Sequence, residues 1–189
     1  NRDLFIAAGI GVVAFDGAVG GARAPLRVII TSAGTVNVNA AVNVATEMSF
    51  AASIINVTGA GSLGASGTAT INLTATRNVA LAAGARMSVF DGALTVSANQ
   101  QVTPTAGDFN GLELADGAVL SSSGAGDITI NARSGNGAAN AGVSLIGTAD
   151  IHASGVGNID ITGVSRGSGT LCCGVHMGFA LNTIRSTGS

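Results

Sequence analysis

Asp150 and His152 are the two side chains of this sequence whose types and spacing could best support chemistry. They flank Ile151, and residues two apart in an extended strand lie on the same face. A carboxylate beside an imidazole can orient the ring and work with it as an acid and base. The pair is therefore the candidate catalytic site, and the alternative interpretation is a solvated surface pair.

Cys172, Cys173 and His176 form a second candidate group. Adjacent cysteines close a vicinal disulfide only with distortion of the peptide between them. Cys-Cys-x-x-His offers three metal ligands, but no second cluster completes a closed site. Three interpretations stay open: thiols packed at a junction of the chain, a Cys172–Cys173 disulfide, and a metal site that includes His176. We expect thiols, with no metal and no cofactor.

A sequence repeat shows which elements must position these residues. Tripeptides preceded by Gly recur, and their last residues lie 31 and 32 positions apart: Leu112-Glu113-Leu114, Val143-Ser144-Leu145 and Val175-His176-Met177. Six residues after Leu114 and Leu145 come Leu120 and Ile151, and fourteen residues after them come Ile128 and Ile159. A fixed period of this size is typical of stacked, solenoid-like folds.

The same spacing extends toward the N-terminus. Successive anchors lie 27, 24, 33, 31 and 32 residues apart, at Ile30, Val57, Leu81, Leu114, Leu145 and Met177. Within each period, segments such as Ile128-Thr129-Ile130 and Ile159-Asp160-Ile161 alternate apolar and small polar residues. Alternation of this kind predicts half-buried strands, three in each period.

Coils explain the repeat better than hairpins do. A chain that winds helically returns each strand to the same lateral position once per turn and so stacks similar residues. Gly124-Ala125-Gly126 and Gly155-Val156-Gly157 fall at equivalent places between the second and third strands, where a tight corner needs a positive φ or a missing side chain. We therefore predict an all-β fold, a right-handed parallel β-helix with about 24–33 residues and three short strands per coil.

Stacked coils would keep the carboxylates apart. The predicted outward neighbours are Asp127 with Asn158 and Thr129 with Asp160, so no two carboxylates stack directly. The counterparts of Asp150 and His152 in the preceding coil are Val119 and Ser121. The chain also lacks Trp and Tyr, the aromatic platforms of sugar-cleaving grooves. These observations argue against an enzyme.

The composition excludes several classes of protein. Apolar residues make up 47% of the chain and charged residues 10%, which suits a long thin core of small and aliphatic side chains. No run of eighteen apolar residues occurs, so we expect no membrane span. The net charge of −2 argues against a nucleic-acid partner, which would need a basic face.

We expect two regions along the chain. Residues 1–30 do not follow the repeat and are predicted to be an irregular cap or first-coil segment, whereas residues 31–189 form the β-helix repeats. The chain starts at Asn1 and stops partway through a period, which suggests a piece of a longer protein. The longer connections after third strands should stack on one side, at 99–110, 132–141 and 164–173.

The segment from Gly142 to Gly163 resembles the repeats of large secreted bacterial β-helical proteins, namely filamentous-haemagglutinin-type adhesins and the passenger stalks of autotransporters and two-partner secretion systems. The resemblance covers roughly residues 50–189 and rests on a Gly, Asn, Thr and Ile pattern. It implies an extracellular or cell-surface bacterial protein. The two cysteines and the lack of Lys depart from the pattern.

Two functions follow as alternatives. The preferred one is a non-catalytic structural or adhesive stalk segment whose partners are other copies or neighbouring segments stacked end to end, or a cell-surface glycan or protein. The alternative is a polysaccharide-acting β-helix enzyme, either a lyase or hydrolase or a spike-like depolymerase. A groove with converging acids among the three longer connections would favour the enzyme.

Overall fold

The structure is a computed structural model that describes residues 2–169, 172–178 and 181–187. These residues form an all-β fold without helices. Its strands are β1 (Leu4–Ala7), β2 (Val12–Phe15), β3 (Arg27–Ser32), β4 (Thr35–Val38), β5 (Ala41–Val44), β6 (Glu47–Val57), β7 (Ser62–Ala65), β8 (Thr70–Leu81), β9 (Arg86–Val89), β10 (Leu94–Ala98), β11 (Leu112–Leu114), β12 (Val119–Ser122), β13 (Ile128–Arg133), β14 (Val143–Leu145), β15 (Asp150–Ala153), β16 (Ile159–Val164), β17 (Val175–Met177) and β18 (Thr183–Ser186).

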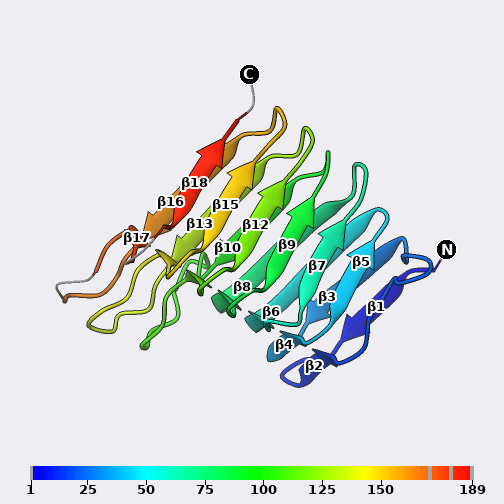
Figure 1. The fold of residues 1–189 in the computed structure, drawn as a ribbon. Coiled ribbons are helices and arrows are strands. Elements are labelled where there is room, and N and C mark those ends of the chain that lie inside the picture. Colours follow the sequence, from blue (N-terminus) through cyan, green and yellow to red (C-terminus); the bar gives the residue numbers. More distant parts are fainter. Residues whose placement is uncertain (1, 170–171, 179–180, 188–189) are drawn as a thin grey trace.

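The strands belong to two sheets, one of twelve strands and one of six, and the described strand pairs are parallel. Figure 1 shows them as rows that run side by side from the N-terminal to the C-terminal end. The strands form three columns, and each column is a stack of strands from successive turns of the chain. The first column contains β2, β4, β11, β14 and β17, the second contains β5, β7, β9, β12, β15 and β18, and the third contains β1, β3, β10, β13 and β16.

Strands β6 and β8 each pass through two columns without a break. The first half of each lies in the third column and the second half in the first column. They are therefore 11 and 12 residues long, rather than the short strands that the repeat predicts. The physical reason is that these turns have no loop at this corner, and a bulge between Ala52 and Ile54 suffices to bend β6.

The predicted register is confirmed from Val57 onward. The first column aligns Val57, Leu81, Leu114, Leu145 and Met177. The second column aligns Leu63, Met87, Leu120, Ile151 and Ile184. The third column aligns Ile71, Leu94, Ile128 and Ile159. Apolar residues thus stack directly on apolar residues from turn to turn.

The prediction was wrong for the first anchor. Ile30 pairs with Phe50 in the third column, and Val38 is the residue that aligns with Val57. The distance from Val38 to Val57 is 19 residues, which is shorter than the expected minimum of 24. Because this turn lacks a loop where later turns have one, the spacing of the longer turns assigns Ile30 to the first column, although it lies in the third.

Inward side chains fill a narrow core between the sheets. Leu114, Leu145 and Ile128 are fully buried, and burial of such a side chain stabilises the fold by about 1.5–3 kcal/mol. The rings of Phe15 and Phe50 stack in adjacent turns with centroids 5.7 Å apart. Ser144 faces away from this core by alternation, yet it is only 3% exposed.

Residues 4–7 and 12–15 lie at the N-terminal end as β1 and β2, which pair with β3 and β4. Val19 makes an isolated parallel bridge with Val42. This segment thus contributes residues to all three columns of a first turn. The proposed capping role of residues 1–30 stays a prediction.

Candidate functional site

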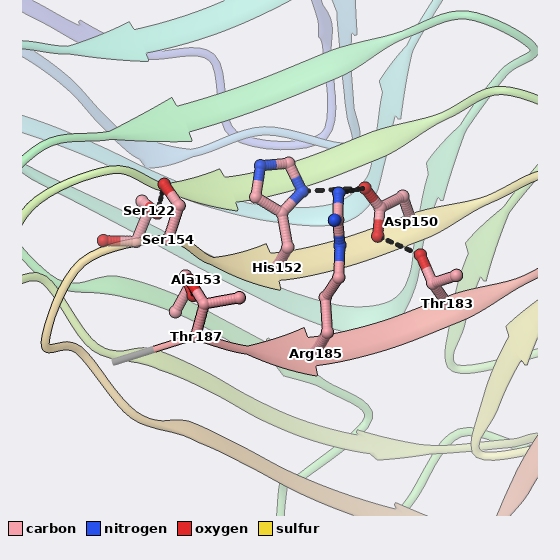
Figure 2. A network of polar contacts seen from close by, with 8 residues as sticks. All are labelled: Ser122, Asp150, His152, Ala153, Ser154, Thr183, Arg185 and Thr187. Atoms are coloured by element: carbon pink, nitrogen blue, oxygen red, sulfur yellow. Dashed lines mark hydrogen bonds and ion pairs between the residues drawn. The ribbon is translucent and has the colours of Figure 1, made fainter. Parts of the chain in front are cut away.

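Asp150 and His152 lie on β15, on either side of Ile151, which is fully buried. Alternation along the strand therefore directs both polar side chains to the outer face of the six-stranded sheet. Their neighbours on β12 are Val119 and Ser121, as predicted. Figure 2 shows the two side chains beside Thr183 and Arg185, which come from β18.

The Asp150 carboxylate has three hydrogen-bond partners. Its Oδ2 lies 2.8 Å from Nδ1 of His152 and 3.2 Å from a terminal guanidinium nitrogen of Arg185, while its Oδ1 accepts a hydrogen bond from the Thr183 hydroxyl. Burial raises the pKa of Asp150, but the hydrogen bonds from Thr183 and Arg185 and the charge and hydrogen bond of His152 outweigh it, so the pKa lies below its usual value. Asp150 is therefore an ionised acceptor near neutral pH.

This arrangement orients His152 but does not resemble a complete catalytic centre. The contact with Asp150 fixes the imidazole through Nδ1, as the carboxylate of a catalytic triad does. However, the carboxylate is already engaged by Arg185 and Thr183, which hold it in its ionised form and weaken it as a base. The sequence predicted the His152 and Asp150 pair, whereas the two partners from β18 were missed because they lie a full turn away.

The cysteine group lies where the third column passes into the first. The Cys172 thiol accepts a hydrogen bond from the Gly169 amide at 3.1 Å and donates one to the Ala138 carbonyl at 3.3 Å. Cys172 forms no disulfide in this structure, and a thiol titration would test the expected thiols against the alternative of a vicinal disulfide with Cys173. His176 lies in β17 opposite Ser144.

Among residues 2–169, 172–178 and 181–187, no three His, Cys, Asp or Glu side chains lie close enough together to hold a metal ion. Cys172, Cys173 and His176 are therefore not brought together as a ligand set.

Three other carboxylates accept hydrogen bonds from the backbone of the following turn. Asp91 accepts a hydrogen bond from the Ala125 amide at 2.9 Å, and Asp127 accepts one from the Asn158 amide at 2.7 Å. Asp116 Oδ1 accepts both the amide and the hydroxyl of Thr148, and these bonds lower the pKa of Asp116. These acids join successive turns at their corners.

The outward rows of β13 and β16 do not stack one acid on another. The register places Thr129 beside Asp160, as predicted, and Asn131 beside Thr162, so neither row brings two acids together. Paired acids about 5–10 Å apart around a sugar-binding groove are what most glycoside hydrolases need. Of these two outward rows of β13 and β16, one contains a single acid, Asp160, and the other contains none.

The three longer connections stack against one another on one side of the molecule, as expected (Figure 1). The Gly135 amide donates to the Phe109 carbonyl at 3.1 Å, and the Gly137 amide donates to the Gly107 carbonyl at 3.1 Å. Arg166 in the third connection donates to the Thr105 carbonyl in the first, at 3.2 Å. The connections therefore form a bonded block rather than separate loops.

Asn99 organises the first of these connections, and sequence reasoning missed it. It is fully buried and has a φ of 57°, a left-handed conformation that Asn tolerates better than most residues. Its Oδ1 accepts the Thr105 amide at 2.7 Å, and its Nδ2 donates to the Ser134 carbonyl at 3.0 Å. The one signal in the sequence was an Asn placed directly after a strand.

Comparisons with known proteins identify no relative of this chain. No protein-family model matches it, and no curated protein and no solved structure matches it. Over the described ranges, no helix is long and apolar enough to cross a membrane. The functional argument therefore depends on the geometry above.

Proposed function

We propose that this chain is a structural or adhesive stalk segment of a secreted bacterial surface or filament protein, of the filamentous-haemagglutinin or autotransporter-passenger type. We infer that the fold is a right-handed parallel β-helix, because parallel crossover connections are nearly always right-handed. The observation that carries the proposal is the in-register stacking of apolar residues in all three columns, for example Val57 to Met177 in the first.

Such a segment acts by adding length to the protein. Each turn adds about 4.8 Å of length, because parallel strands repeat at that spacing, and backbone hydrogen bonds run along the whole stack. The carboxylates support this role, since Asp91, Asp116 and Asp127 are used to join one turn to the next. Side chains committed to such contacts are poorly placed for catalysis.

The proposed setting is extracellular or on the bacterial cell surface. The partners are other copies of the chain or neighbouring segments of a longer protein, which would stack end to end, with a cell-surface glycan or protein as a further binding partner. Electron microscopy of the intact particle tests this proposal. Filaments or a surface layer with a repeat near the strand spacing are expected, and a compact monomeric enzyme would contradict it.

The polysaccharide-acting enzyme is kept as a second candidate because of one contact, that between Asp150 and His152 at 2.8 Å. Purified protein and the Asp150→Ala variant should be incubated with a panel of bacterial and plant polysaccharides. The stalk proposal expects no turnover from either protein. Turnover that disappears in the variant would favour the enzyme.

A further inference from the structure

The strand pair of β15 and β18 is held together differently from the pair of β12 and β15. Leu120 and Ile151 are fully buried, whereas Ile184 of β18 is 38% exposed, and the four residues of β18 are exposed. Apolar burial therefore contributes less to the attachment of β18 than to that of the preceding strands. Backbone pairing and polar side chains must supply more of it.

Two of the three partners of the Asp150 carboxylate belong to β18. Thr183 and Arg185 both donate to it from positions paired with Asp150 and His152. This side-chain contact therefore joins the two turns directly. Figure 2 shows the carboxylate in contact with His152 on its own strand and with Thr183 and Arg185 of β18.

The charged and titratable groups that face Asp150 can be named from each packed element. Its own strand contributes His152, and β18 contributes Arg185. On β12, the paired residues Val119 and Ser121 carry no charge. Arg86 lies one strand further away, on β9, in the same row as Val119. The charge at Asp150 is thus balanced by Arg185, and His152 is its titratable neighbour.

Protonation of the Asp150 carboxyl would remove its negative charge and with it the attraction to Arg185. A carboxylate whose pKa lies below its usual value in the folded state stabilises the fold above the pKa of the unfolded chain, about 3.9 for Asp, and this stability is lost as the pH falls through the folded pKa. In acid, the guanidinium of Arg185 then faces a neutral carboxyl, and the attraction between the two groups is lost.

We propose that Asp150 is an acid-sensitive clasp between the turns of β15 and β18. While ionised, it holds β18 in place; once protonated, it releases β18 before the core below unfolds. Release uncovers the edge of β15, whose backbone groups can then pair with another chain. The proposal concerns a conformational device and does not depend on the stalk function.

Hydrogen exchange of the whole chain, followed by mass spectrometry between pH 7 and pH 3 and corrected for the intrinsic exchange rate, tests the clasp. In the unmodified protein, the exchange rate of the β18 amides relative to the intrinsic rate should be about tenfold higher at pH 3 than at pH 7. A change of this size is expected when hydrogen bonds to a charged group are lost. Amides of β12 should keep their protection. Asp150→Asn should show the fast exchange of β18 already at pH 7 and little further change in acid.

Asp160→Asn is the matched control, because Asp160 is an exposed carboxylate on the neighbouring strand β16. It should behave like the unmodified protein. Arg185→Gln and Thr183→Val retain Asp150 while removing its partners, so they test the clasp even if Asp150→Asn does not fold, and both should speed exchange of β18 at pH 7. Unchanged exchange of β18 in Asp150→Asn, or an acid response that persists in that variant, would overturn the proposal.

Discussion

At the scale of single residues, the polar side chains of this protein act mainly as connectors between turns. Asp116 holds the amide and hydroxyl of Thr148, and Asn99 holds a connection through both ends of its side-chain amide. A buried polar group costs free energy unless it is hydrogen-bonded, which explains why Asn99, which is fully buried, has so many partners. Removing the Asn99 side chain should therefore destabilise the protein more than removing an exposed polar side chain would.

Replacement of Asn99 by Ala should lower the free energy of unfolding by about 1–3 kcal/mol, because it leaves the Thr105 amide and the Ser134 carbonyl without partners. Ala also tolerates the left-handed backbone at this position poorly. Urea denaturation measures the effect. Asn72→Ala, at an exposed position of β8, is the control and should stay within about 0.5 kcal/mol. Equal losses in the two variants would contradict the role of Asn99.

Replacement of Leu145 by Ala should cost about 2–5 kcal/mol, since the side chain is fully buried and its loss leaves a cavity. Asp160→Ala should stay within about 0.5 kcal/mol, because Asp160 is exposed on β16. Ile159 is only half-buried, so Ile159→Ala should cost less than Leu145→Ala. Chemical denaturation of the three variants checks the order, and similar losses at Leu145 and Asp160 would show that the faces are assigned wrongly.

At the scale of the elements, the corners between the second and third columns decide how closely the turns approach. A Cβ on Gly157 would stand 2.1 Å from the Gly126 carbonyl oxygen, and one on Gly155 would stand 2.0 Å from the Gly124 carbonyl oxygen. None of these glycines has a positive φ. Of the two reasons that the sequence offered for them, the missing side chain is therefore the correct one.

Gly157→Ala should destabilise the protein by about 1–3 kcal/mol, because the added methyl group must push apart two backbone segments. Gly17→Ala is the control: no atom lies within 4 Å of its added Cβ, so the variant should be neutral or slightly stabilised. Thermal unfolding of both variants is the measurement. A lower melting temperature for Gly17→Ala than for Gly157→Ala would argue against close stacking at this corner.

At the scale of the whole molecule, stacking leaves apolar residues open at the C-terminal end of the described core. Val175 and Met177 of β17 are 39% and 47% exposed, although their counterparts Val143 and Leu145 are fully buried. The outer edges of β16, β17 and β18 have no strand partner among the described residues. An open edge of this kind favours pairing with another strand.

We therefore expect the chain of residues 1–189 to self-associate end to end as its concentration rises. Multi-angle light scattering over a concentration series is the measurement, and adding Lys at the apolar end through Met177→Lys should reduce association without unfolding the core. Ser88→Lys, on the outer face of β9, is the matched control and should associate like the unmodified chain. A monodisperse monomer at high concentration would contradict the expectation.

Alternation and spacing in the sequence were enough to predict the stacking partners from Val57 onward and the outward pair of Asp150 and His152. These features are local, since alternation sets the faces and a regular period sets the neighbours. The sequence did not show which residues of successive turns contact each other, such as Arg185 and Asp150. It also did not show how short the turn from Val38 to Val57 is, and both features were found in the folded structure. These contacts depend on the length and path of each connection between strands. A connection can lack a loop, as in β6, or fold into a block around Asn99, and the alternation of the strands stays the same in both cases.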